Sequence, residues 1–500
     1  MKSNIKYYNV LLLFFLLITA SCDDNFLDVN EDPNRPTDVP VSVLLPAVEA
    51  RLAFVYGGLH ARIPAHFVHY YSGHRNQHLR YDQWDIQLPD NNRIWTELYA
   101  GVLQDILEME TKAIEEESFT YVGIGKVLKA LTYAMLTDSF GDIPFSQALQ
   151  VIDNITPAYD TQESIYPQLI AMLDEAIVDL GRNSSQSPGT DDFIYRGDTD
   201  LWIRFANSLK LRLLNRTSKR TPDAAIAFLN TNPPLISENS QNAEVSFFAT
   251  ATQENPMYQL DNLSGFQDNS LSAQFLQRLE GLNDPRIPFF FEPVTNNDAI
   301  GIAGKVSGLD DDDSGRSKYS RIGAAFAAAD APVPFITAAG VLFTIAEVQL
   351  RANNAGAAET AYNSAVRADF QRLNTTTAGK PEVNLLTSTD RGSIIGEISA
   401  AAIESYLVQT SVAFDGTLAR IIEQKYISNF VNPAEGWFDW RRTGFPDDFI
   451  TPTTNLTIGV RPRRLPHPES EINFNSKSLS AGPGIPRKDV TLLERVWWDQ

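Results

Sequence analysis

The sequence predicts a mostly α-helical protein, and three observations support this fold class. Apolar residues recur at the spacing of amphipathic helices along most of the 500-residue chain. Segments rich in Gly, Pro, Asn and Asp separate these stretches, and few runs alternate between polar and apolar residues as half-buried strands do. Hydrophobic residues make up 43% of the chain, which is enough for a large core.

The first element is an N-terminal targeting segment, residues 1–21. Lys2 and Lys6 supply positive charge, Val10–Ile18 is an unbroken apolar run, and small residues precede Cys22. A bilayer-spanning helix takes about 20 apolar residues, so this shorter run is typical of a secretory signal peptide. We expect residues 1–21 to be removed on export.

Cys22 is the only cysteine in the chain, so it cannot form an internal disulfide. Its position directly after the targeting segment is typical of a bacterial lipoprotein, in which the sulfur carries a diacylglyceryl group. The alternative is an ordinary signal peptide with an accidental cysteine at the cut. Residues 22–40 are acidic and hold three prolines, so we expect an extended tether behind the lipid. No later stretch is expected to reach membrane-spanning length, which leaves the lipid as the only membrane attachment.

Helical periodicity predicts a single folded domain over residues 41–500. The expected helices cover residues 41–56, 94–114, 121–140, 163–180, 200–217, 270–279, 338–351, 357–373, 394–407 and 417–430. Short turns between some of them indicate helix pairs, although no period of about 34 residues stands out. Long irregular segments between the helices are the expected places for recognition.

The charge and the motifs exclude several classes of function. The formal net charge is −21, which repels nucleic acid and anionic lipid, so nucleic-acid binding is excluded. The sequence has no HExxH, no GxSxG and no phosphate-cradling Gly-rich loop, and no cofactor is expected. A carboxylate pair for glycoside hydrolysis stays open, because an acidic chain holds many candidate pairs.

Five of the six histidines lie within residues 60–78, in a segment that is also rich in aromatic and amide side chains. Rings beside amides and charged donors are typical of a sugar site, where rings stack on sugar faces and polar groups bind hydroxyls. We predict that the ligand-binding residues are Tyr70, Tyr71, His74, Asn76, Gln77, Tyr81 and Trp84. The alternative is that these residues pack the first helices together or form a partner interface. No metal is expected, although His66/His69 and His74/His78 have the helical spacing of metal ligands.

Two further runs are interpreted as structural. Residues 436–442, GWFDWRR, are expected to anchor the core, with the arginines paired to acids such as Glu423. The acidic run Asp310–Asp313 lacks the alternating spacing of a calcium loop and is expected to be a solvated loop.

The chain resembles the SusD/RagB family of nutrient-binding outer-membrane lipoproteins of Bacteroidetes over nearly its whole length. Seven segments in the family's order carry the resemblance: FLDVNEDPNRPTDV (26–39), HYYSGHRNQHLRYDQWD (69–85), ALTYAMLTDSFGDIPFSQAL (130–149), NDPRIPFFF (283–291), FITAAGVLFTIAEVQLRANN (335–354), IIEQKYISNFVNPAEGWFDWRRTGFP (421–446) and RPRRLPHPESEINFN (461–475).

The resemblance implies a single SusD-like α-helical domain, with tetratricopeptide-like helix pairs as scaffold and irregular loops and short helices on one side. It implies a cell-surface binding protein that acts as a lid on a SusC-like TonB-dependent transporter in the outer membrane. Ligands in the family are usually oligosaccharides, and a peptide ligand stays possible. Two other hypotheses are a glycan-degrading hydrolase and a helical-repeat scaffold that binds only proteins.

Overall fold

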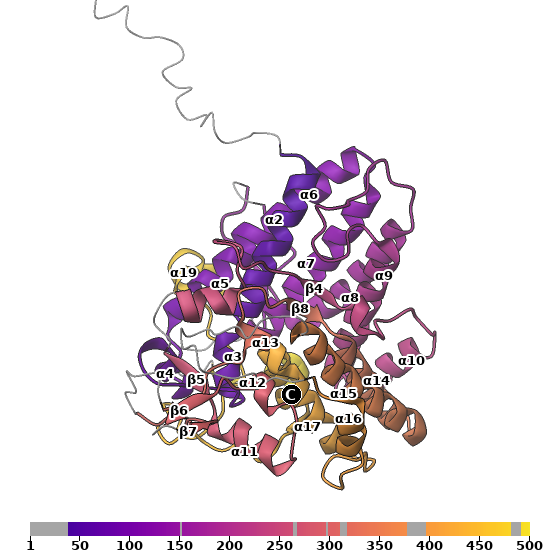
Figure 1. Ribbon diagram of the computed structural model, residues 1–500. Helices are drawn as coiled ribbons and strands as arrows, with labels where there is room; N and C mark the ends of the chain where they lie inside the picture. Colours follow the sequence, from indigo (N-terminus) through magenta and orange to yellow (C-terminus); the bar gives the residue numbers. More distant parts are fainter. Residues whose placement is uncertain are drawn as a thin grey trace, which may run out of the picture. The chain divides into compact units, whose positions relative to one another are not determined.

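The computed structural model describes residues 39–150, 153–263, 268–296, 299–310, 318–377, 397–481 and 492–500. Val41–Gln500 forms one compact unit, which is described by itself. The described part is mostly helical with four small two-stranded sheets (Figure 1), so the predicted fold class is confirmed. Cys22, the targeting segment, the tether up to Asp38 and residues 311–313 of the acidic run lie outside the described residues.

The longer helices are α2 (Val41–Phe54), α6 (Gln104–Glu115), α7 (Phe119–Phe140), α8 (Gln162–Leu180), α9 (Thr199–Arg216), α11 (Ala273–Gly281), α14 (Ala338–Arg351), α15 (Ala355–Thr377), α16 (Ala400–Leu407), α17 (Leu418–Ser428) and α18 (Pro433–Thr443). Most of the longer helices follow the predicted ranges, but α16 begins at Ala400 instead of residue 394, and α18 lies outside every predicted range. Shorter helices are α3 (Arg62–Phe67), α4 (Asn76–Asp82), α5 (Asn92–Thr96), α10 (Ala224–Leu229), α12 (Ile287–Phe290), α13 (Ala324–Ala327), α19 (Glu469–Phe474) and α20 (Ser476–Ala481). Three π-helical segments are Val55–Leu59, Glu97–Leu103 and Tyr258–Leu263.

Helices that follow one another in sequence mostly pack side by side. In Figure 1, α2, α6, α7, α8 and α9 form one group, and α14 to α17 form a second group below it. Helix α9 contacts both α8 and α14, so it joins the two groups. This stacking of neighbours is compatible with tetratricopeptide-like helix pairs.

Helix α7 shows how the sequence sets an element's bounds. It is buried along most of its length, and it ends at Gly141, whose φ of +80° favours glycine. The predicted end of this helix at Gly141 is therefore confirmed.

Helix α11 begins later than predicted. Ser270 and Leu271 belong to strand β5 (Asn269–Leu271), which pairs with β1 (Tyr71–Gly73). Ser272 then caps α11, because its Oγ accepts a hydrogen bond from the backbone N–H of Gln274 at 3.1 Å. The pairing of two strands distant in sequence decided this boundary, and single-helix periodicity does not report it.

The other small sheets also join distant segments. Strand β4 (Ala243–Val245) pairs with β8 (Val333–Ile336), β2 (Ile143–Pro144) with β3 (Tyr159–Asp160), and β6 (Val294–Asn296) with β7 (Ala299–Gly301). Gly73 in β1 is needed for close approach, because a Cβ there would lie 2.1 Å from the carbonyl carbon of His78. Helix α4 therefore folds tightly back on β1.

One helical run in the described part, Val41–Phe67, is long and apolar enough to cross a membrane by length and composition. The expectation that no later stretch reaches this length is therefore wrong. Most of its apolar window, 56%, is buried inside the protein, and α2 packs on α6 and α7. A core helix meets the same criteria.

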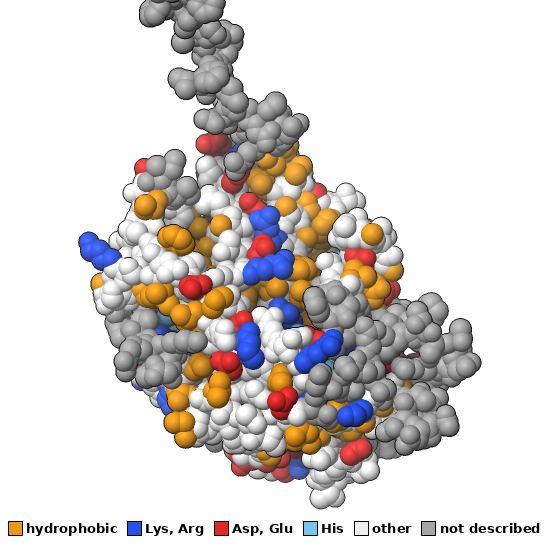
Figure 2. Space-filling model, turned by 90° about the vertical axis from the view of Figure 1, so that its left-hand side faces the viewer, with side chains coloured by type: hydrophobic (Ala, Val, Ile, Leu, Met, Phe, Trp, Pro, Cys, Tyr) orange, Lys and Arg blue, Asp and Glu red, His pale blue; other side chains and the backbone are white. Residues whose placement is uncertain are grey.

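The surface mixes charges of both signs. On the face in Figure 2, Lys and Arg side chains lie beside Asp and Glu in a central band, with hydrophobic side chains on both sides. On this face, charges of both signs therefore lie side by side.

Candidate functional site

A surface groove lies between α11, α17 and the loop after α18. Its two adjoining hollows measure about 340 Å³ and about 210 Å³, and they share Arg278, Glu423 and Asp448. The larger hollow is also lined by His69, Gln274, Gln277, Gly281, Leu282, Tyr426, Phe449 and Ile450, and the smaller one by Asp415, Thr417, Ala419, Arg420, Phe445, Pro446 and Asp447. The combined groove is large enough for a small organic ligand.

The two helices present these side chains through their helical periodicity. In α11, Phe275, Leu276 and Leu279 are buried, which leaves Gln277 exposed and Arg278 partly exposed at the surface. In α17, Ile421 and Ile422 are buried, and Glu423 is partly exposed. Because each helix buries one stripe, its remaining side chains are available to form the groove.

Arg278 lies at the centre of the groove. Its Nη1 donates to Glu423 Oε1 at 2.9 Å, and its Nη2 bonds to Asp448 Oδ1. Its guanidinium lies 5.5 Å from the ring centre of Tyr426 and 5.8 Å from that of Phe449. Burial disfavours the charged form, but Tyr426, Asp448 and Glu423 outweigh it and raise the pKa of Arg278.

Phe449 forms the aromatic wall of the groove. The ring is partly exposed and packs edge-on against Tyr426, with 5.3 Å between ring centres. His69 contacts the same ring at 5.6 Å, and the Arg461 guanidinium lies 4.9 Å from its centre. The ring is thus held by its neighbours while part of it faces the groove.

Arg461 and His69 fix the loop that carries Phe449. Arg461 Nη2 donates to the carbonyl of Ile450 at 2.7 Å, and His69 Nε2 donates to the same carbonyl at 2.8 Å. His69 Nδ1 then accepts from Ser307 Oγ at 3.0 Å. Burial, together with the adjacent Arg461 charge, lowers the pKa of His69 to about 3, so the ring is neutral in the groove wall.

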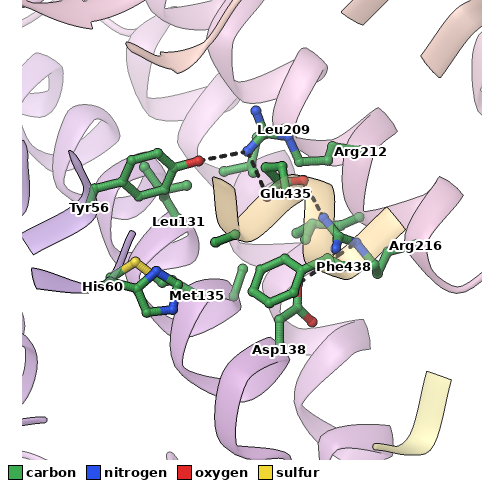
Figure 3. Close-up of a pocket in the computed structure, with 13 residues that line it drawn as sticks. Tyr56, His60, Leu131, Met135, Asp138, Leu209, Arg212, Arg216, Glu435 and Phe438 are labelled. Atoms are coloured by element: carbon green, nitrogen blue, oxygen red, sulfur yellow. Dashed lines mark hydrogen bonds and ion pairs between the residues drawn. The ribbon is translucent and has the colours of Figure 1, made fainter. Parts of the chain in front are cut away.

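A second cavity lies in the interior between α7, α9 and α18 and is only about 10 Å³ (Figure 3). Arg216 Nη2 donates to Glu435 Oε2 at 2.5 Å, and Arg212 Nη1 donates to Glu435 Oε1 at 3.3 Å and to Tyr56 Oη at 3.4 Å. This volume holds about one water molecule. The cavity therefore belongs to a buried polar network that joins helices and is too small for a nutrient.

The structure buries the rings predicted to bind ligand. Tyr70, Tyr71, Tyr81, Trp84 and His74 are each at most 4% exposed. Tyr70 stacks on Tyr426 with 4.6 Å between ring centres, and Trp84 lies under Arg461 at 5.1 Å. These contacts match the packing alternative, and in this arrangement the rings offer no open face to a sugar.

The two amides of the predicted set lie nearer the surface. Asn76 is exposed and donates from Nδ2 to Asp268 at 2.8 Å, and Gln77 donates from Nε2 to Asp90 at 2.9 Å. Both hydrogen bonds hold α4 to neighbouring segments. A ligand role for the seven residues stays a prediction, and the groove described above offers partly exposed side chains instead.

Little in the sequence pointed to the groove residues. Arg278, Glu423, Phe449 and the two glutamines come from three segments far apart in the chain. Glu423, Tyr426, Phe445 and Pro446 fall inside one of the quoted family segments, residues 421–446. His69, which begins another such segment, contacts Phe449 and so brings the aromatic segment to the edge of the groove.

The histidine pairs did not assemble as their spacing suggested. His66 Nε2 lies 3.1 Å from His78 Nδ1, so His66 meets His78 instead of His69. Within the described residues, no group of three or more His, Cys, Asp or Glu side chains is placed to hold a metal ion.

The run GWFDWRR is part of the core, as predicted. Trp437, Phe438, Arg441 and Arg442 are at most 4% exposed. The predicted pairing with Glu423 is wrong, because Arg442 bonds to Glu347 at 2.5 Å and Glu423 belongs to Arg278 and Arg420. Helix α17 carries Glu423 on the groove side.

Comparison with protein families gives one match over most of the chain. The model of the SusD-like family, described as starch-binding and associating with the outer membrane, matches residues 33–468. None of the curated proteins matches the chain.

Solved structures share this fold. A SusD/RagB family protein from Bacteroides thetaiotaomicron has a TM-score of 0.78 and 23% identity, covering 92% of this chain and 99% of that chain. A protein described as chitin-binding has a TM-score of 0.76 and 22% identity over 92% and 100% of the two chains. A chitin-binding SusD homolog from Flavobacterium johnsoniae has a TM-score of 0.73 and 23% identity over 92% and 97%. At these identities the likeness establishes the fold.

Proposed function

Because the chain belongs to the SusD-like family of binding proteins associated with the outer membrane, we propose that it captures an oligosaccharide in the groove between α11 and α17. The observation that carries this proposal is the partly exposed Phe449 ring beside Arg278, Gln277 and Glu423 in an open groove of about 340 Å³. A ring that stacks on a sugar face and polar groups that bind hydroxyls are the two elements of such a site.

The groove is proposed to bind without turnover. Members of the family are binding proteins rather than enzymes. Glycoside hydrolysis needs one protonated and one ionised carboxyl group. In the groove, Glu423 and Asp448 both bond to the same guanidinium of Arg278, so neither is free to act as the acid or base of such a pair. Incubation with neutral oligosaccharides is expected to release no new reducing ends, and their release would assign the chain to the hydrolases.

The chain is further proposed to deliver its ligand to a SusC-like TonB-dependent transporter as a lid. The lipid on Cys22 and the tether over residues 22–40 would hold the body at the outer membrane and facing the cell exterior. The support is the family match and the lipoprotein pattern of the N-terminus. A gene for a TonB-dependent transporter is expected beside the gene for this chain, and its absence from the genome would contradict the proposal.

Phe449→Ala tests the site directly. Removal of the ring is expected to weaken binding of a neutral oligosaccharide about tenfold or more, which corresponds to ~1.4 kcal/mol. Isothermal titration calorimetry on the full-length protein in detergent measures the change. Phe474→Ala is the matched control, because this ring on α19 is 80% exposed and is not among the groove residues. Equal affinities for the wild type and Phe449→Ala would remove the groove from the proposal.

A further inference from the structure

The distribution of charge in the groove points to a class of ligand. Resting on the proposed function, we infer that the groove takes amine-bearing oligosaccharides, such as glucosamine oligomers, in preference to saccharides that carry uronic acid or sulfate groups.

The first observation is the number of charges of each sign. The two hollows are lined by the carboxylates of Asp415, Glu423, Asp447 and Asp448, and by the guanidiniums of Arg278 and Arg420. His69 adds no positive charge, since burial lowers its pKa to about 3. The lining therefore carries an excess of negative charge.

The second observation is the depth of each charge. The side chains of Arg278 and Arg420 are only 12% and 14% exposed. The side chains of Asp448 and Asp415 are 66% and 45% exposed, and Asp447 is exposed as well. An entering ligand meets carboxylates first, because the guanidiniums lie below them.

The third observation is that both guanidiniums are already bound to carboxylates. Arg278 bonds to Glu423 and Asp448, and Arg420 lies 3.5 Å from Asp415 and 3.5 Å from Glu423. An anionic sugar would compete with these carboxylates for the same donors, and it would be repelled by the ones at the rim.

A protonated amine on the sugar is expected to bind more tightly for the same reason that an anionic sugar binds more weakly. The rim carboxylates attract the amine, whereas the Phe449 ring already lies near the guanidiniums of Arg278 and Arg461 and serves the sugar face. Contacts between exposed charges change affinity by up to about fivefold each and weaken with salt. The groove chemistry thus favours a sugar that combines a ring face with a protonated amine.

Calorimetry on the full-length protein in detergent tests the inference with three tetrasaccharides of glucosamine, N-acetylglucosamine and galacturonic acid. At about pH 6 the sugar amine is protonated. At low salt, the glucosamine tetramer is expected to bind at least threefold tighter, and the galacturonate tetramer at least threefold weaker, than the neutral tetramer. High salt is expected to narrow both differences.

Asp447→Asn removes one negative charge from the rim of the groove. It is expected to narrow the gap in affinity between the glucosamine and galacturonate tetramers, measured as the ratio of their dissociation constants, by about threefold. The control Asp200→Asn, at the exposed start of α9, is expected to leave the gap unchanged. A galacturonate tetramer that binds as tightly as the glucosamine tetramer, or a gap that Asp447→Asn does not alter, overturns the inference.

The calorimetry with the three tetrasaccharides also distinguishes a failure of this inference from a failure of the proposed function. Binding of the neutral tetramer without any charge preference overturns the inference alone. Failure of all three tetramers to bind contradicts the proposed function itself. A tetralysine peptide that displaces the glucosamine tetramer at lower concentration than the sugar itself would assign the groove to peptides and overturn the saccharide class.

Discussion

At the scale of single residues, burial separates the aromatic side chains that build the core from those that face a ligand. Trp84 and Phe449 both lie near Arg461, at 5.1 Å and 4.9 Å from its guanidinium. Trp84 is 1% exposed, whereas Phe449 is partly exposed. Both are aromatic rings beside the same guanidinium, so their exposure to solvent is what separates their roles.

Trp84→Ala is expected to destabilise the protein by about 3–5 kcal/mol, because it removes a fully buried indole and leaves a cavity. Urea unfolding followed by circular dichroism measures the loss. Trp497→Ala is the control, since Trp497 is only partly buried and should cost less. Unchanged stability together with lost oligosaccharide binding would assign Trp84 to the ligand site instead of the core.

Buried histidines give a second residue-scale prediction, on pH. Burial, and then the adjacent Arg464 charge, lower the pKa of His467 to about 3, well below its ordinary value of about 6.5. Between these two values the unfolded chain binds the proton and the folded chain does not. The contribution of His467 to stability is therefore complete above about pH 6.5 and is lost as the pH falls toward 3.

His467→Gln isolates this contribution, because other buried acids titrate in the same range. The unfolding free energy of the wild type relative to the variant is expected to fall by about 1 kcal/mol per pH unit from pH 6 to pH 4. Urea unfolding across this range provides the values. A difference that does not change with pH would mean that His467 takes up its proton in the folded state.

At the scale of elements, a buried ring of charges joins α14, α17 and α18. Lys425 Nζ lies 2.7 Å from Glu347 and 3.0 Å from Asp439, and Arg442 Nη2 lies 2.5 Å from Glu347 and 2.9 Å from Asp439. The negative charges of the two carboxylates and the positive charges of the two basic side chains compensate each other in the protein interior. Replacement of one partner leaves a charge uncompensated, which costs more than the pairing itself contributes.

Glu347→Gln is accordingly expected to cost about 3–5 kcal/mol of unfolding free energy, because Lys425 and Arg442 would stay buried with one carboxylate between them. The matched control is Glu404→Gln, which removes a surface partner of Arg367 and should leave the urea midpoint unchanged. A similar midpoint for both variants would contradict a special role of the buried ring.

At the scale of the whole molecule, we propose separate tasks for the N-terminus and the folded body. The body over Val41–Gln500 carries the groove and its packing. The proposed lipid on Cys22 would supply membrane attachment, since the one apolar helical run in the described part is mostly buried.

Cys22→Ser is expected to move the protein from the membrane fraction to the soluble fraction, because the variant lacks the thiol that would carry the lipid. Cell fractionation followed by immunoblotting measures the shift, and labelling with a palmitate analogue is expected to be lost in parallel. A variant that stays in the membrane fraction would show that attachment depends on another part of the chain.

The sequence by itself determined the helical class, most helix bounds and the family. Periodicity and capping act within a few neighbouring residues, so the bounds of α7, α8, α9 and α14 could be predicted from the chain alone. The start of α11 could not, because it depends on the pairing of β1 with β5 across the fold.

Only the tertiary structure decided which aromatic and charged side chains face solvent. The segment around Trp84 has the composition of a sugar site, yet packing against Tyr426 and Arg461 buries its rings. Arg278, Glu423 and Phe449 come from three separate elements and meet only after α11 and α17 pack near the loop behind α18. Exposure is a property of the packed chain, because long-range contacts cover one ring and leave another open.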